Sequence, residues 1–410
     1  MKRLFLLVLV QIIVFAFLNN VYAESCQLRG SLRALGKVFT HSPNELDIAE
    51  SRLKLELIST EGENTSFKIK SYLTYDSITK QKDLILQEAF VDYYSDLVDV
   101  RFGKQIIAWG KADEINPTDI LNPQDLSNFS EEKNIRKIGL AALKTEWKLS
   151  DYILDAIWKI EYDNVKLPPL SSRWALFNIP GLSELPDPEY PDNKLQNTEW
   201  AFKLSRTVSL FDLSISYFDG WDNIATPVFS LNPTTQKTQL EKLKIFRTKM
   251  IGVDFSGSVS SFGLWGEAAY FIPYSSNDPL VKNPYLQYVL GSDYTFDNGI
   301  KVNLQYFQEI NKEKSDEEIM SKLGIGMPLH QAISFRVEKK FGEIEEHSIE
   351  LLGTYDMKGH GLFFQPKLIL SPEDAFKIEV GLVLYSGEKD SIFSNFANND
   401  HAFLKSTYSF

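Results

Sequence analysis

The sequence predicts an all-β fold, a transmembrane antiparallel up-and-down β-barrel. Three observations support this prediction. Segments of about ten residues alternate apolar and polar side chains, and short turns alternate with long polar loops along the chain. The last ten residues, HAFLKSTYSF, also form an amphipathic segment that ends in Phe410. Because a strand directs successive side chains to opposite faces, such alternation suits a wall between lipid and a watery lumen.

The N-terminal segment has the anatomy of a secretory signal. Lys2 and Arg3 precede an apolar run over residues 4–18, and Ala23 ends a short stretch that suits a signal peptidase. We therefore expect residues 1–23 to be removed by cleavage after Ala23, and residues 24–410 to form the barrel. A retained membrane anchor is the alternative. Cys26, the only cysteine, cannot form an internal disulfide.

Charge excludes one class of partner. The chain has 43 Lys and Arg and 55 Asp and Glu. Loss of Lys2 and Arg3 leaves 41 against 55, a formal charge of −14. A surface this acidic argues against nucleic acid as a partner.

The strands follow one another from residue 28 to the C-terminus. In segment 48–58, leucines alternate with charged residues such as Arg52 and Lys54. Strands in the core of a soluble protein seldom carry a row of charges on one face. Strands of a transmembrane barrel often do, on the face that lines the lumen. The same alternation recurs at 67–74, 154–161, 211–217, 300–306 and 376–384.

The connections set the strand number. Tight turns are expected near 95–96, 150–151, 207–208, 257–258, 298–299, 341–342 and 371–372. Longer loops are expected at roughly 108–137, 164–196, 219–246, 273–284, 311–328 and 386–400, with a shorter one at 356–360. Asn298-Gly299 is typical of a type I′ hairpin. The strand at 48–58 needs an antiparallel partner, which 28–39 supplies, so we predict about 18 strands with both ends periplasmic. The alternative is 16.

Polar residues on one parity form the candidate lumen face. Arg101 and Gln105 share a face, and Glu88 and Asp92 take the equivalent face of the preceding strand. Adjacent strands thus bring carboxylates towards a guanidinium, either to set solute selectivity or to stiffen the wall. The predicted lumen lining consists of Arg52, Lys54, Lys68, Lys70, Glu88, Asp92, Arg101 and Gln105.

The first long loop contains a small duplication, Asn116-Pro117-Thr118-Asp119 followed by Asn122-Pro123-Gln124-Asp125. Asn is a preferred N-cap and Pro suits the first helical position, so we predict two short helical turns. An ordered loop over residues 109–137 is expected to fold inward and to narrow or plug the lumen. The predicted constriction residues are Trp109, Asp113, Asp119 and Asp125.

A metal site is the rival interpretation of the acidic residues in this loop. It would use Asp113, Glu114, Asp119 and Asp125, whose spacing matches no calcium loop. We therefore predict neither metal nor cofactor.

The segment from Gly103 to Leu126 also resembles a known family. Its pattern, GKQ, then WG, then the two Asn-Pro turns, is similar to a largely uncharacterised family of proteobacterial outer-membrane porin-like barrels with a Gly-Arg-Gln, Trp-Gly and Asn/Asp-Pro signature. Lys104 stands where the family has Arg. The resemblance covers roughly residues 84–130 and implies a channel-like protein in the outer membrane of a Gram-negative bacterium. Some relatives are thought to work beside inner-membrane exporters of hydrophobic molecules.

The expected function is passage of small solutes through a lumen narrowed by residues 109–129. We predict no enzyme, because the five histidines lack metal-ligand spacing and no glycine-rich phosphate loop opens a helix. The first alternative is an envelope export component for lipid or another hydrophobic molecule, with a periplasmic or inner-membrane partner. A hydrolase and a structural or adhesive barrel are further alternatives. Outer-membrane lipid and the barrel-assembly machinery, which would recognise the strand ending in Phe410, are the other expected partners.

Overall fold

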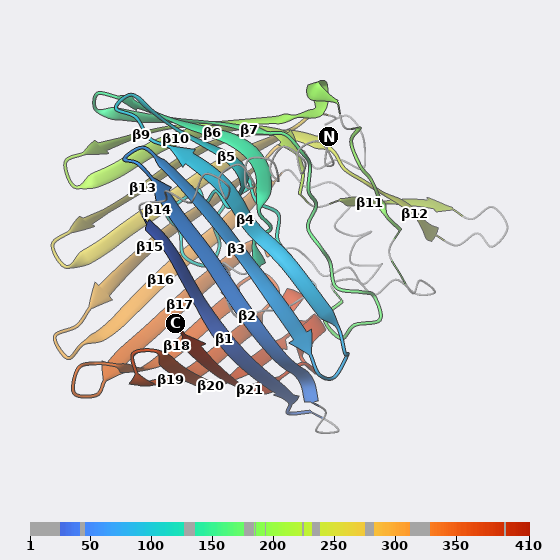
Figure 1. Cartoon of the computed structure of the whole chain (residues 1–410). Coiled ribbons are helices and arrows are strands. Elements are labelled where there is room, and N and C mark those ends of the chain that lie inside the picture. The colour runs from blue at the N-terminus through green and yellow to red at the C-terminus, as the bar shows by residue number, and fades with distance from the viewer. Residues whose placement is uncertain are drawn as a thin grey trace.

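The barrel is a single closed ring of strands. The computed structural model describes residues 25–41, 46–126, 136–175, 184, 186–192, 194–223, 225–231, 238–274, 283–311, 329–388 and 391–410. Within these residues, 18 antiparallel strands form one sheet, which closes because β1 pairs with both β2 and the last strand, β21 (Figure 1). The predicted barrel is confirmed with 18 strands. The predicted signal peptide, residues 1–23, lies outside the described residues, as does the loop segment 127–135.

Each strand follows its predecessor around the ring. In ring order the strands are β1 (Ser25–Phe39), β2 (Leu46–Glu61), β3 (Thr65–Asp76), β4 (Lys82–Tyr93), β5 (Val98–Gln105), β6 (Leu140–Leu149), β7 (Tyr152–Lys159), β9 (Glu199–Val208), β10 (Phe211–Trp221), β13 (Arg247–Val259), β14 (Phe262–Pro273), β15 (Tyr285–Thr295), β16 (Ile300–Asn311), β17 (Gln331–Phe341), β18 (His347–Asp356), β19 (Gly361–Glu373), β20 (Phe376–Gly387) and β21 (His401–Ser409).

Minor elements lie in the long connections. Strands β8 (Pro188–Glu189), β11 (Thr226–Leu231) and β12 (Thr238–Lys244) form a small separate sheet, and β11 and β12 project beyond the barrel (Figure 1). Two short 3₁₀ helices are η2 (Leu195–Asn197) and η3 (Ile392–Phe396). Across the ranges described, no helix has both the length and the apolar character needed to cross a membrane.

Short and long connections alternate as predicted, with short turns at one end of the barrel and long ones at the other (Figure 1). Three turns lie two or three residues later than expected, because the strands before them continue to Val208, Val259 and Glu373. The prediction of a type I′ hairpin at Asn298-Gly299 was wrong. Only Gly299 has a positive φ there, +77°, and its N–H donates to the carbonyl of Phe296 (2.8 Å) in a longer turn.

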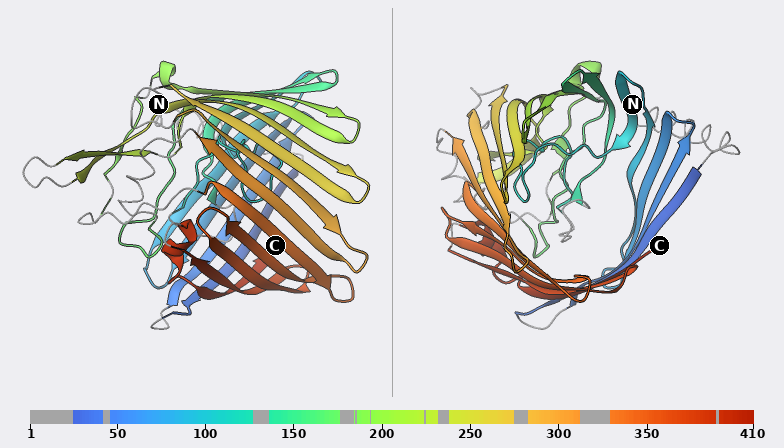
Figure 2. Two further views of the ribbon diagram at one scale, coloured as in Figure 1. Left: turned by 180° about the vertical axis from the view of Figure 1, so that it is seen from behind. Right: turned by 90° about the vertical axis from the view of Figure 1, so that its left-hand side faces the viewer.

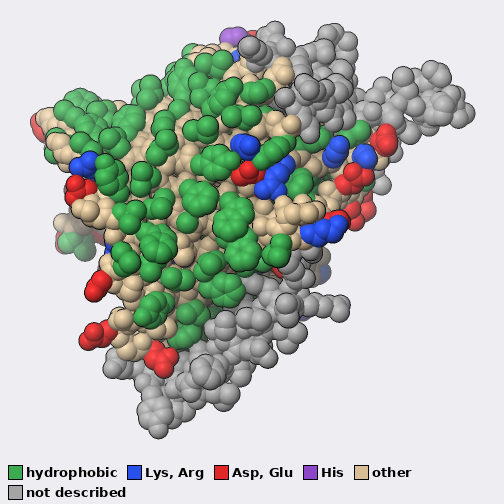
Figure 3. All heavy atoms as spheres, turned by 90° about the horizontal axis from the view of Figure 1, so that it is seen from above, with side chains coloured by type: hydrophobic (Ala, Val, Ile, Leu, Met, Phe, Trp, Pro, Cys, Tyr) green, Lys and Arg blue, Asp and Glu red, His purple; other side chains and the backbone are tan. Residues whose placement is uncertain are grey.

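The two faces of the wall differ as the alternation predicted. On β21, His401 and Lys405 are buried on the inner side, whereas Leu404 and Tyr408 are about half exposed on the outer side. Hydrophobic side chains cover the middle of the outer face in Figure 3, and charged side chains gather towards its two ends. Because lipid tails solvate only apolar groups, this surface suits a membrane.

The C-terminal residue closes the seam of the ring. Phe410 donates to and accepts from the backbone of Gly30 (2.9 and 2.8 Å). Its ring lies where a Gly30 side chain would be, because a Cβ there would stand 2.3 Å from Phe410 Cζ. The amphipathic final strand is thus joined to the first strand by backbone hydrogen bonds up to the last residue.

Substitution of Gly30 by Val should weaken this seam, because the added atoms collide with the Phe410 ring, at a cost of about 1–3 kcal/mol. The fraction of fast-migrating folded barrel on an unheated gel, measured against incubation temperature, should fall at a lower temperature than in the wild type. Gly36→Val is the matched control, since a Cβ at Gly36 of the same strand meets nothing within 4 Å. Equal behaviour of the two variants would contradict the seam interpretation.

Candidate functional site

A segment that we call the strap, residues 106–126, leaves β5 and lies inside the barrel (Figure 2). Its side chains Ile107, Trp109 and Leu121 are at most 6% exposed. They pack in one cluster with inward residues of the wall such as Met250 and Phe271. Burial of these apolar groups holds the strap against β6, β7, β9, β10, β13 and β14.

One carboxylate on the wall fixes the middle of the strap. Glu267 Oε1 on β14 accepts the N–H groups of Lys111 (2.5 Å) and Ala112 (2.6 Å). Its Oε2 accepts the N–H and the hydroxyl of Thr118 (3.2 and 2.9 Å). Glu267 is only 3% exposed, so these four bonds replace its hydration.

The glycine of the Trp-Gly motif makes this approach feasible. Gly110 has φ +82°, a conformation that favours glycine. A Cβ there would stand 2.2–2.6 Å from side-chain oxygens of Asn116, Glu267 and Thr118. Any larger residue would therefore push the strap off its carboxylate anchor.

The strap then reaches the far wall. Gln305 on β16 accepts the N–H of Asp113 (3.0 Å) and donates to the carbonyl of Ile115 (3.1 Å). Arg336 on β17 donates to Glu114 (2.7 Å). Counting from β5 along successive paired strands, β17 is nine steps away in a ring of 18, so it is diametrically opposite. The strap therefore spans the full width of the lumen.

The prediction of two capped helical turns was wrong. Asn116 to Asp119 form a single β-turn, in which the N–H of Asp119 donates to the carbonyl of Asn116 (3.2 Å). Asn122 begins no helix. Its amide instead accepts from the Ile107 N–H (2.8 Å) and donates to the Ile138 carbonyl (2.8 Å). Asn122 thus ties the outgoing and returning arms of the loop together rather than capping a helix.

The four acidic residues of the strap pair with three cations. Asp113 and Glu114 contact Arg336 (3.6 and 2.7 Å). Asp119 pairs with buried Lys137 and accepts the Trp109 N–H (3.3 Å), and Asp125 pairs with Lys166 (3.5 Å). No group of three or more potential metal ligands occurs in the part of the chain that the structure describes.

Arg136, where the loop returns to the wall, adds a partly buried cation near the strap. Burial lowers the pKa of its guanidinium, and the Glu114 carboxylate acts in the opposite direction. The Glu114 carboxylate in the strap therefore attracts the Arg136 guanidinium at the return of the loop.

Most of the candidate lumen residues of β2–β5 belong to ion pairs. Arg52 pairs with Glu50 (2.9 Å). Lys68 pairs with Glu88 and with Glu56 (3.2 Å each), and Glu56 also pairs with Lys54 (3.0 Å). Some of these pairs lie within β2 and others join β2, β3 and β4. The role of these residues in passage of solutes stays a prediction.

Of the two carboxylates expected beside Arg101, Asp92 bonds it directly and Glu88 acts on it through its charge. The Arg101 guanidinium binds Asp92 with two hydrogen bonds (2.6 and 3.0 Å) and lies over the Phe90 ring at 4.0 Å. Lys70 lies over the Tyr72 ring. Gln105 is fully buried and donates to the Ala142 carbonyl (3.0 Å), which fixes the point where the strap leaves the wall.

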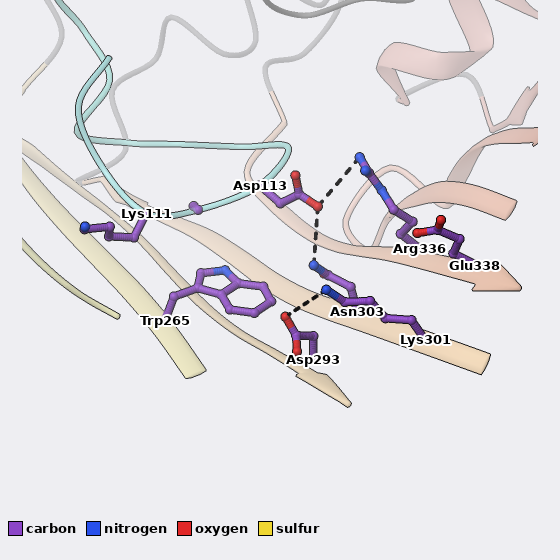
Figure 4. Close-up of a pocket in the computed structure, with 9 residues that line it drawn as sticks. Lys111, Asp113, Trp265, Asp293, Lys301, Asn303, Arg336 and Glu338 are labelled. Carbon is purple, nitrogen blue, oxygen red and sulfur yellow. Dashed lines mark hydrogen bonds and ion pairs between the residues drawn. The ribbon is translucent and has the colours of Figure 1, made fainter. Parts of the chain in front are cut away.

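Two cavities flank the strap. The turn-side pocket, of about 370 Å³, lies towards the short turns and mixes Asp113, Lys111 and Arg336 with the Trp265 indole (Figure 4). In that view Lys111 and Asp113 approach from the strap, and Asp293, Lys301 and Asn303 from the wall. The loop-side pocket, of about 290 Å³, lies on the strap's other face. Its wall residues come from the strand ends next to the long loops: Phe218, Trp221, Thr248, Phe271 and Tyr285.

Comparison with known proteins adds a family and a fold. A family model described as "Protein of unknown function (DUF1302)" matches residues 56–314, which is 259 of the 410 residues. The chain belongs to this family. The matched region runs from β2 to the end of β16 and includes the whole strap. No curated protein sequence matches the chain.

Two solved structures are similar in fold. Acinetobacter baumannii OccAB2 aligns with a TM-score of 0.55 and 9% identity, over 95% of this chain and 98% of that chain. Pseudomonas aeruginosa OccK11 (OpdR) aligns with a TM-score of 0.54 and 10% identity, over 95% and 97%. The chain thus has the closed antiparallel barrel of outer-membrane porins.

Proposed function

We propose that the protein is an outer-membrane channel of a Gram-negative bacterium that passes small solutes through a lumen narrowed by the strap. The contact between Glu114 and Arg336 carries the proposal, because it joins the strap to the strand opposite its origin. A barrel of this strand number leaves a water-filled channel unless something fills it. The strap occupies that space only in part, since a cavity remains on each of its faces.

The second candidate function is a plugged barrel that hands lipid or another hydrophobic molecule outward with a periplasmic or inner-membrane partner. The four hydrogen bonds onto Glu267 favour it, because such an anchor keeps the strap in place unless a partner displaces it. The proposed partners also include the barrel-assembly machinery, through the strand that ends in Phe410.

Single-channel recording in a planar bilayer distinguishes these functions. We expect the wild-type barrel to show small, steady conductance steps that rise with salt, because ions pass beside the strap. A silent wild type that conducts once the strap is removed would support the plugged export component instead. Silence from both proteins would contradict the channel and leave the enzymatic and structural alternatives.

A further inference from the structure

The loop-side pocket is lined by aromatic side chains, which a water-filled lumen does not require. Phe218 and Phe271 are 2% and 7% exposed, and the Phe271 ring stacks on Tyr285 with centroids 4.6 Å apart and planes 12° apart. The Trp221 indole completes this side of the wall. Porin interiors are typically polar, so a cluster of inward aromatic rings marks a place where apolar contact is used.

Part of that aromatic surface supports the strap, and part of it faces empty space. Phe218 and Phe271 belong to the cluster that packs on Leu121. Beyond the cluster the cavity of about 290 Å³ remains, with Ile120, Pro123 and Leu126 of the strap on its other side. An apolar cavity of about 150 Å³ suffices to bind benzene. The loop-side pocket therefore has room for a flat molecule of two fused rings.

Several polar groups around the pocket have partners within the protein, and one buried acceptor, Asn223 Oδ1, has no hydrogen-bond partner among the residues that the structure describes. Asp119 pairs with Lys137, and the Asn122 amide binds the backbone of both loop arms. The Asn223 amide donates to the Ile120 carbonyl (2.6 Å). An anionic ligand would lose its hydration here and would face the Asp119 and Asp222 carboxylates, whereas an uncharged apolar ring would gain contact on both faces.

We propose that the loop-side pocket binds a small, flat, uncharged aromatic solute between the strap and the wall. This inference names the solute class of the proposed channel and so rests on that function. The turn-side pocket, on the opposite face of the strap, mixes acidic and basic side chains and offers no comparable apolar surface. Solute would accordingly be retained on the loop side of the strap.

Calorimetric titration with indole tests the proposal, using the full barrel in nanodiscs and empty nanodiscs as the blank. Thr248→Trp fills the loop-side pocket, because Thr248 lines it and is 9% exposed. We expect indole to bind the wild type saturably and Thr248→Trp about tenfold more weakly or worse. Lys301→Trp, which adds the same bulk to the turn-side pocket, should bind like the wild type. Heat-shifted gel mobility verifies that each variant has folded.

Three outcomes would overturn the proposal: no saturable binding by the wild type, unchanged binding by Thr248→Trp, or equal loss in Lys301→Trp. Indole-2-carboxylate binding as tightly as indole would also contradict it. Failure here is separable from failure of the proposed function. A barrel that conducts ions but ignores indole loses only this inference, whereas one that binds indole but never conducts loses the channel function.

Discussion

A barrel with Glu267→Ala should conduct in larger and more variable steps than the wild type. Removal of the carboxylate leaves the N–H groups of Lys111, Ala112 and Thr118 without their acceptor. Each buried unpaired group costs about 1–3 kcal/mol, so the strap should leave the wall and hydrate in the lumen. Single-channel recording in a planar bilayer measures the result.

Glu338→Ala is the matched control for this charge change. Glu338 is a carboxylate of β17 that lines the turn-side pocket, and the contacts of the strap described above do not involve it. Its loss should leave the size and steadiness of the steps near the wild-type values. If both variants widened the channel equally, local charge rather than the strap would set the conductance. If Glu267→Ala conducted like the wild type, the strap would not form the constriction.

The second large effect is a loss of barrel stability when a buried ion pair in the wall is broken. Lys159 on β7 and Glu199 on β9 are each 1% exposed and pair at 2.9 Å. Lys159→Met leaves the Glu199 carboxylate buried without its cation, which typically costs about 3–5 kcal/mol. The folded band on unheated gels should therefore disappear at a markedly lower temperature than in the wild type.

Replacing both partners provides the internal control. The double variant Lys159→Met with Glu199→Leu buries two apolar side chains and no charge, so it should recover most of the lost stability. Part of the loss should persist, because Glu199 also accepts the Trp221 N–H (3.3 Å). A double variant less stable than Lys159→Met alone would show that the carboxylate has a structural role independent of the lysine.

The sequence was sufficient for the barrel because its signal is local. Alternation within a strand depends on neighbouring residues only, and it predicted the outward and inward faces of β21. The alternation of short turns and long loops along the chain then predicted the strand number. Turn positions at Val208, Val259 and Glu373 were missed because the alternation there continues past the residues that looked like turn formers.

The anchors of the strap were missed because their partners are distant in sequence. Glu267 holds Thr118 from 149 residues away, and Arg336 holds Glu114 from 222 residues away. The Asn-Pro pairs suggested helix caps because capping is a local device, whereas Asn122 uses its amide across the loop. One signal was present: Glu267 is a lone acid in the apolar run LWGEAAYF, on the inward parity of its strand.

The long reach of the strap has a consequence for the order of assembly. The strap follows β5, but its anchors Glu267, Gln305 and Arg336 belong to β14, β16 and β17, which are synthesised much later. Until β14 has joined the barrel, the strap has no Glu267 carboxylate to bind. Contacts between segments so far apart in sequence form only after the intervening strands are in place. The constriction is therefore completed late in biogenesis, after the far wall exists.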